Sequence, residues 1–206
     1  MMSFAISNYN QESLDTILRL AYIAESREWD NRSHLERVRF YCYLICRELE
    51  MSQKDTELIS IACVLHDVGK IVLPEIIINN TENYNPSERA QIENHTIEGS
   101  NLLANAKSQF LQIGEIIALS HHERWDGSGY PKGLVGEEIP LTGRICAVAD
   151  VFDSLTSKRA YKPTISTTEA FNLLSNAGNS LFDPKIVSLF TNTRFEVQRI
   201  YDSVPG

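Results

Sequence analysis

The chain contains five histidines, and each lies in a setting that suits a metal ligand. They are His34, His66, His95, His121 and His122. Asp67 follows His66 directly, and Asp150 interrupts the apolar stretch ICAVADVF. A buried carboxylate without a compensating partner is energetically costly. Because these histidines and aspartates occur together, a shared metal site explains the pattern better than a set of unrelated side chains.

The size of this donor set predicts more than one ion. Five imidazoles and two carboxylates exceed the normal needs of a single ion, so two ions bridged by a carboxylate are expected. Nitrogen and oxygen donors without thiolate suit iron or manganese, and suit zinc, cobalt or nickel less well. Paired ions about 3.5–4 Å apart can activate a hydroxide and stabilise both oxygens of a phosphoryl displacement. The donors therefore indicate hydrolysis of a phosphoester.

Lys70 adds a positive charge beside this set. It follows Asp67 by three positions, so on a helix both side chains project from nearly the same face. A lysine at that place is suited to neutralising phosphate oxygens. Gly69-Lys70 is not a P-loop, because Ile71 stands where Ser or Thr is required. The sequence also has no HExxH motif.

Helices must bring these residues together. The stretch 58–65 is apolar all round except Ser60, which predicts a central buried helix carrying His66 and Asp67 about 100° apart. The helix that starts after Asn85 is expected to reach His95, and IIIN (76–79) is the best strand-like candidate. Helix-start patterns occur at Ser52, Asn85-Pro86, Ser166 and Asp183-Pro184. We expect an all-α fold with about seven or eight helices.

Composition narrows the class of protein. The chain has 206 residues and a formal net charge of −8, which argues against a nucleic-acid partner. No apolar run is long enough to span a membrane, and residues 1–14 lack the features of a secretory signal, so we expect a cytoplasmic protein without a membrane partner. The four cysteines form no CxxC pair and are expected to be small buried hydrophobes.

The order H, HD, H, HH, D resembles that of the HD phosphohydrolase superfamily. The longer stretches HDVGK, HHERWDGSGYPKGL and RICAVADVFDSLTSKRAYK are similar to motifs of its HD-GYP branch. The HD dipeptide alone is a weak pattern, whereas HHE-x-x-DG-x-GYP is specific. The resemblance covers roughly 28–190, with 1–27 as an N-terminal helical extension and 191–206 as a C-terminal tail.

The resemblance implies an HD-domain helical bundle with a metal site between the central helices. It implies two divalent ions, with a third left open, and iron as the first choice and manganese as the second. The implied reaction is hydrolysis of cyclic di-GMP to linear pGpG, and on to GMP if the centre is trinuclear. The resemblance also implies that Asp67 bridges two ions and that the ligands are His34, His66, Asp67, His95, His121, His122 and Asp150.

Further roles follow from the resemblance. Asp30, one helical turn before His34, stands where some members have a glutamate for a third ion, but it is one methylene shorter. Lys70, Arg159 and Lys162 match positions that contact substrate phosphates.

Residues near the ligands have candidate roles as well. Asp153 is expected to support a ligand or to assist proton transfer, so it joins Asp67 and Lys70 as a candidate catalytic residue. Glu123 and Asp126, which follow His121 and His122, are candidates to support these two ligands. Tyr130 belongs to an aromatic rim assigned to substrate binding, although contact with a partner protein is an open alternative.

Two other functions stay open. A phosphodiesterase for cyclic GMP-AMP or another nucleotide would use the same metal chemistry. Residues 79–88 differ from the Lys-Pro-Gly-type stretch common in the branch, which leaves substrate selectivity undecided. The third reading is an inactive receptor or scaffold that binds nucleotide or a diguanylate cyclase domain. Such a domain, or a separate regulatory protein, is the expected macromolecular partner.

Overall fold

The computed structural model describes residues 11–25, 32–78, 84–157, 164–177 and 180–204. Within these ranges the chain forms α-helices and short 3-10 helices and no strand. The α-helices are α1 (Gln11–Glu25), α2 (Arg32–Glu48), α3 (Gln53–Ala62), α4 (Glu75–Ile78), α5 (Pro86–Glu93), α6 (His95–Leu103), α7 (Gln109–Ser120), α8 (Leu141–Thr156), α9 (Thr167–Ala177), α10 (Pro184–Asn192) and α11 (Arg194–Ser203). The 3-10 helices are η1 (Cys63–Leu65), η2 (Val68–Val72) and η3 (Gly136–Glu138).

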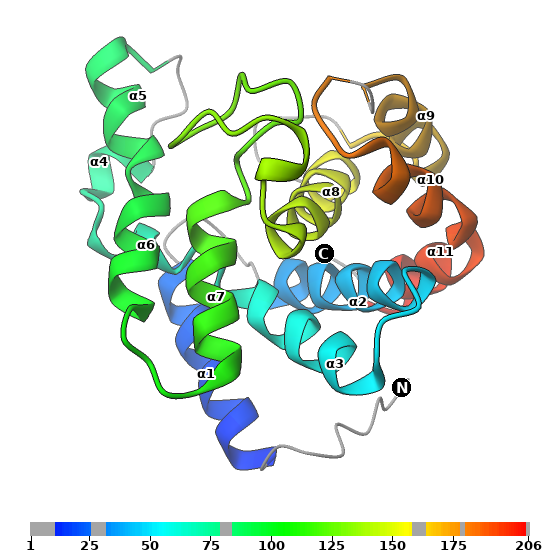
Figure 1. Ribbon diagram of the computed structural model, residues 1–206, viewed down its shortest axis with the longest axis horizontal. Helices are drawn as coiled ribbons and strands as arrows, with labels where there is room; N and C mark the ends of the chain where they lie inside the picture. The colour runs from blue at the N-terminus through cyan, green and yellow to red at the C-terminus, as the bar shows by residue number, and fades with distance from the viewer. Residues whose placement is uncertain (1–10, 26–31, 79–83, 158–163, 178–179, 205–206) are drawn as a thin grey trace.

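Helices α2, α3, α7 and α8 form the centre of the molecule (Figure 1). Each contributes an isoleucine that is at most 2% exposed: Ile45, Ile61, Ile117 and Ile145. Helix α6 packs on α7, and α10 and α11 pack on α2. This buried apolar centre fixes the relative positions of the helix ends at which the candidate ligands lie.

The all-α class is confirmed, and local capping explains several helix starts. The Ser52 hydroxyl accepts a hydrogen bond from the Asp55 amide, and Asp183 accepts one from the Lys185 amide. Asn85 forms a full capping box with Glu88. The helices outnumber the seven or eight expected, because breaks divide stretches that look continuous in the sequence.

One such break changes the predicted place of the HD pair. The central helix α3 ends at Ala62, η1 follows, and Asp67 has φ −103° and ψ 10°. His66 and Asp67 therefore lie at a junction between two 3-10 helices and not on the central helix, so the expected 100° relation does not apply. Lys70 lies on η2 instead of the same α-helix.

Two further expectations need correction. The helix that begins after Asn85 ends at Glu93, and His95 is the first residue of a separate helix, α6. Residues 76–78 of the strand-like stretch belong to helix α4, since short apolar runs do not distinguish strand from helix; residue 79 lies outside the described residues.

The remaining segments join the same core. Residues 191–206, expected to form a tail, include α11, whose Val197 and Ile200 are 0% and 4% exposed and belong to the core. The four cysteines are free and buried, as expected. None of the helices in the described ranges combines the length and the apolar character needed to cross a bilayer.

Candidate metal centre

Most of the candidate ligands lie at the ends of helices. His34 is the third residue of α2, His95 is the first residue of α6, and His121 directly follows α7. His66 and Asp67 occupy the junction between η1 and η2. Only Asp150 lies inside a long helix, α8. Ligands from five segments far apart in the sequence thus converge on one region.

Small residues allow these segments to approach closely. A Cβ atom at Gly69 would clash with the carbonyl oxygen of His95 and the backbone of Gly99. A Cβ atom at Gly143 would clash with the side chain of Ser120, at the end of α7. Glycine at 69 therefore brings η2 against α6, which places Asp67 beside His95.

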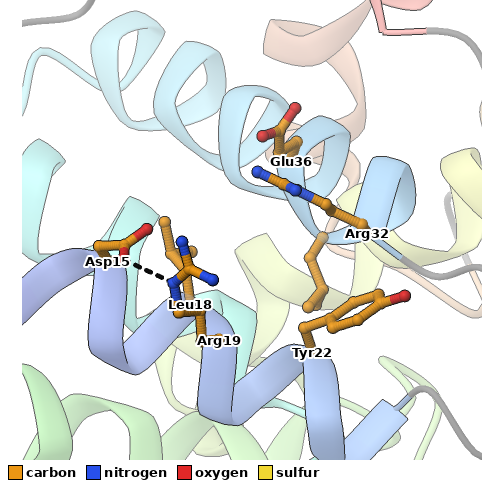
Figure 2. A pocket seen from close by; sticks show the side chains of 7 residues that line it. Asp15, Leu18, Arg19, Tyr22, Arg32 and Glu36 are labelled. Carbon is orange, nitrogen blue, oxygen red and sulfur yellow. Dashed lines mark hydrogen bonds and ion pairs between the residues drawn. The ribbon is translucent and has the colours of Figure 1, made fainter.

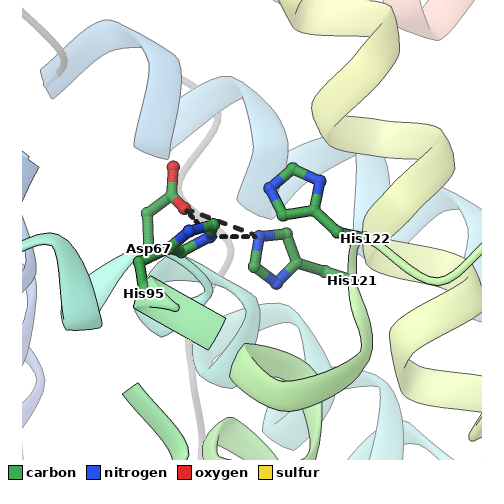
Figure 3. A group of neighbouring side chains, drawn as sticks. All are labelled: Asp67, His95, His121 and His122. Atoms are coloured by element: carbon green, nitrogen blue, oxygen red, sulfur yellow. Dashed lines mark hydrogen bonds and ion pairs between the residues drawn. The ribbon is translucent and has the colours of Figure 1, made fainter. Parts of the chain in front are cut away.

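The first ligand group consists of Asp67, His95, His121 and His122 (Figure 3). Asp67 Oδ1 lies 3.1 Å from His95 Nε2 and 3.5 Å from His121 Nε2. The two Nε2 atoms are 3.4 Å apart. One donor atom from each of the four residues lies within 4.8 Å of the others, so the group is compact enough to surround one ion.

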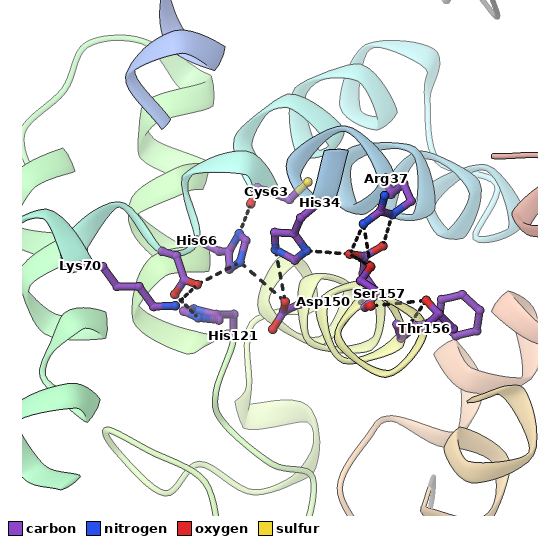
Figure 4. A network of polar contacts seen from close by, with 12 residues as sticks. His34, Arg37, Cys63, His66, Lys70, His121, Asp150, Thr156 and Ser157 are labelled. Atoms are coloured by element: carbon purple, nitrogen blue, oxygen red, sulfur yellow. Dashed lines mark hydrogen bonds and ion pairs between the residues drawn. The ribbon is translucent and has the colours of Figure 1, made fainter. Parts of the chain in front are cut away.

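The second ligand group contains His34, His66 and Asp150 (Figure 4). Asp150 Oδ1 lies 3.6 Å from His34 Nε2 and 3.8 Å from His66 Nε2. The other oxygen of Asp67, Oδ2, lies 3.5 Å from His66 Nε2. Asp67 therefore directs one oxygen to each group, which is the arrangement that a bridging carboxylate requires.

The orientation of the imidazoles fits metal binding. The Nδ1 atom of His66 lies 2.8 Å from the Cys63 carbonyl, and that of His95 lies 2.6 Å from the Ile92 carbonyl. His121 Nδ1 faces two carbonyls in the same way, each at 3.1 Å. Because a carbonyl only accepts, each Nδ1 carries the hydrogen, and each Nε2 presents its lone pair to the ligand groups.

The unsatisfied atoms support the same conclusion. His66 Nε2 and Asp67 Oδ1 are buried and make no hydrogen bond within the described residues. Such atoms are costly unless a partner compensates them. Both atoms point into the ligand groups, where a divalent cation would supply the missing partner, so the residues present fit a metal site.

His34 is held differently, by side chains. Its Nδ1 lies 2.8 Å from Asp153 Oδ2, and Arg37 donates through Nε to Asp153 Oδ1 at 2.6 Å. Asp153 is 0% exposed and Arg37 is 2% exposed. Arg37 also donates to the Val204 carbonyl at 2.8 Å. Sequence reasoning missed Arg37, because nothing in its type or spacing distinguishes it from a surface arginine.

Charges in the site follow from burial and from these contacts. Burial lowers the pKa of His66 to about 4, so it is neutral at pH 7. Burial acts to raise the pKa of Asp67, but Lys70 and the nearby histidines hold it well below its usual value. Burial acts to lower the pKa of His34, yet its hydrogen bond to Asp153 and nearby carboxylates raise it to about 9. Without metal, His34 thus holds a proton that a cation would displace.

A family model described as HD domain matches residues 19–186. The chain belongs to the HD domain family.

Two relatives agree with this assignment, and a solved structure has a similar fold. The chain is 37% identical over 196 residues to the cyclic di-GMP phosphodiesterase response regulator RpfG of Xanthomonas campestris pv. campestris, covering 95% of this chain and 52% of that protein. It is 34% identical over 195 residues to 3'3'-cGAMP-specific phosphodiesterase 2 of Vibrio cholerae, covering 95% of this chain and 37% of that protein. Bd1817, an HDG"Y"P protein from Bdellovibrio bacteriovorus, matches with a TM-score of 0.62 at 20% identity, covering 89% of this chain and 57% of that chain.

These matches confirm the resemblance to the HD family that the motifs predicted, and the likeness to Bd1817 shows a shared fold. The chain spans about half of the length of RpfG and less of the Vibrio cholerae relative.

The loop that carries Gly129-Tyr130-Pro131, called the GYP loop below, lies against the first ligand group. The Tyr130 ring stacks on His122, with centroids 4.8 Å apart and an interplanar angle of 25°. Glu123, which is 3% exposed, accepts hydrogen bonds from the amides of Lys132 and Leu134. Exposed Asp126 accepts one from the Ser128 amide. Both acids thus support the fold of the loop and do not contact the histidine ligands directly.

The structure brings most of the predicted site residues together. The predicted histidines, Asp67 and Asp150 form the two groups, Lys70 Nζ lies 2.7 Å from Asp67 Oδ2, and Asp153 lies behind His34. Asp30, Arg159 and Lys162 lie outside the described residues. Glu25, which sequence reasoning did not select, lies near His34 and His66 and is only 2% exposed.

Proposed function

We propose that this chain is a metal-dependent phosphodiesterase that hydrolyses cyclic di-GMP to linear pGpG, and further to GMP if a third ion binds. The observation that carries the proposal is the Asp67 carboxylate, which faces a ligand group with each oxygen. Nitrogen and oxygen donors without thiolate suit iron or manganese, and the resemblance to the family puts iron first and manganese second. The name of the relative RpfG supports cyclic di-GMP as the substrate.

Divalent ions bound in these groups would activate water and neutralise charge on the scissile phosphate. The protein's own part is to hold the donors rigid and to bind the substrate. The Lys70 ammonium, beside Asp67 Oδ2, is placed to contact a phosphate oxygen. We assign Arg159 and Lys162 to further phosphate contacts and Tyr130 to the rim of the substrate site.

Asp153 acts in this proposal as a positioning residue. It is fully buried behind His34 and is hydrogen-bonded to Arg37 and Ser157. Its carboxylate accepts the hydrogen of His34 Nδ1, which fixes the orientation of the ring and makes its Nε2 a stronger ligand. Direct proton transfer to substrate does not suit a group with no exposed surface.

The test uses the whole chain purified without oxygen. Metal content is measured by elemental analysis, and cyclic di-GMP turnover is measured on the same sample by chromatography. We expect at least two equivalents of iron or manganese per chain and conversion to pGpG. Absence of turnover in protein that contains its metal would overturn the proposal.

Cyclic GMP-AMP is the second candidate substrate. The 34% identity to a 3'3'-cGAMP-specific phosphodiesterase favours it specifically. Parallel assays with cyclic di-GMP, cyclic GMP-AMP and cyclic mononucleotides separate the candidates by kcat/KM. Binding of a nucleotide without turnover would instead favour the receptor or scaffold reading.

The proposed setting is the cytoplasm, where cyclic dinucleotides act as second messengers. A diguanylate cyclase domain or a separate regulatory protein is the proposed macromolecular partner. Binding of the chain to a purified cyclase domain, measured in a pull-down with and without cyclic di-GMP, tests whether that domain is a partner.

A further inference from the structure

Helix α1 buries one narrow face against the HD core. Ala21 and Ala24 are each 1% exposed, and Glu25, at the end of the same face, is 2% exposed. Leu20 and Ile23, on the outer face, are 58% and 54% exposed. Because alanine side chains are small, the α1 backbone lies close to η1 and η2, which carry the HD pair between them. The helix thus directs a carboxylate toward the metal centre.

The Glu25 carboxylate joins the second ligand group. One of its oxygens and ring nitrogens of His34 and His66 all lie within 4.8 Å of one another. Donor atoms of a single ion, at about 2.0–2.2 Å from the metal, lie at most about 4.4 Å apart. Small side-chain rotations are therefore sufficient for these three residues to bind one cation.

The local charge also favours a cation at this place. Asp150 faces the same two histidines, and Asp67 contributes its Oδ2 atom. Three carboxylates close together repel one another, and the two positive charges nearby are Lys70 beside Asp67 and, without metal, protonated His34, whose proton a cation would displace. A divalent ion among them removes most of that repulsion.

We infer that Glu25 is a carboxylate ligand of the ion held by His34 and His66. The inference rests on the proposed metal centre and adds a ligand from α1, a helix that supplies none of the predicted histidine or aspartate ligands. It gives the second group a second carboxylate beside Asp150, in addition to the shared Asp67. The position of α1 then directly affects how tightly that ion is bound.

The test compares Glu25→Gln with Asp15→Asn. Gln keeps the size of the side chain and removes its charge. Asp15 is the matched control on α1, because it loses the same charge while lying at the surface, where it pairs with Arg19 in the cleft between α1 and α2 (Figure 2). Chelator-treated protein is titrated with Mn²⁺ by calorimetry, and the metal bound per chain is measured after desalting.

We expect Glu25→Gln to lose one equivalent of Mn²⁺, or to bind it at least about tenfold more weakly, as the loss of a group that holds a metal typically does. Asp15→Asn should match the unchanged chain. Circular dichroism verifies that each variant is helical, and Glu25→Asp, which keeps the charge on a shorter side chain, should weaken the same ion less.

Unaltered Mn²⁺ stoichiometry and affinity in a folded Glu25→Gln variant would overturn the inference and leave the proposed function intact. If the unchanged chain binds no Mn²⁺ at all, the metal centre and this inference fail together.

Discussion

His95 and His121 are oriented by main-chain carbonyls of their own neighbourhoods, whereas His34 is oriented by Asp153, 119 residues away in the sequence. The carbonyl partners lie three or four residues before each imidazole, so forming the local helix is enough to set the ring. Asp153 must instead be brought to His34 by the packing of α8 on α2.

The tertiary contacts that orient His34 extend beyond Asp153 to Arg37 and α11. Arg37 links that carboxylate to the Val204 carbonyl, at the end of α11. The orientation of His34 in the second ligand group therefore depends on the tertiary packing of α2, α8 and α11, whereas His66 in that group is oriented by a local carbonyl, as His95 and His121 are. Changes far from the metal centre should disturb the second group before the first.

Removing Asp67 should have the largest effect, because it serves both groups. Asp67→Ala should reduce turnover to background and lower the bound metal, as each group loses an oxygen donor. Metal per chain and the initial rate with cyclic di-GMP measure this. Asp15→Ala, at an exposed acid on α1 that pairs with Arg19, is the control. Normal metal content in Asp67→Ala would contradict the bridging role.

Replacing Lys70 should separate binding of metal from turnover. Its ammonium contacts Asp67 Oδ2 without being a ligand itself. Lys70→Ala should keep the metal of both groups and lower kcat/KM by about 10²–10³, the usual effect of removing one group that stabilises transition-state charge. Elemental analysis and steady-state kinetics on one sample are sufficient. Unchanged kinetics would mean that Lys70 is a structural ion-pair partner only.

Asp153→Asn should affect one group and spare the other. Asn lacks the negative charge that makes Asp153 a strong acceptor for His34 Nδ1 and that pairs with Arg37, so the ion of the second group should bind about 10–100-fold more weakly. The ion of the first group should keep its affinity. A two-site Mn²⁺ titration distinguishes the two, and equal weakening of both ions would show that the groups are not held independently.

The sequence predicted the features that local chemistry determines. The caps at Ser52, Asn85 and Asp183 form with near neighbours, and the structure shows each of them. The histidine and aspartate ligands were selected by residue type and order, which need no knowledge of packing. Their convergence into two groups agrees with that selection.

The residues that the sequence did not indicate depend on tertiary packing. Arg37 and Glu25 resemble ordinary surface charges on helices, and only their neighbours in space bury them. The break before His66 was also missed, because an apolar stretch gives the same pattern whether it continues as an α-helix or tightens into 3-10 turns. Hydrophobic periodicity reports burial and does not report the point at which a helix changes type.

Glu123→Gln should have the smallest effect on metal binding and turnover. It tests whether the first ligand group is held by local carbonyl contacts and not by the GYP loop. The Glu123 carboxylate anchors the GYP loop through the amides of Lys132 and Leu134, and that loop places Tyr130 on His122. Gln can accept one of these hydrogen bonds but lacks the charge, which should cost about 1 kcal/mol of unfolding free energy. Because His95 and His121 keep their carbonyl partners, metal content should not change, while KM should rise a few-fold as the rim loosens. Urea unfolding, elemental analysis and kinetics measure these three quantities, and loss of metal from this variant would show that the first group depends on the loop as strongly as the second depends on Asp153.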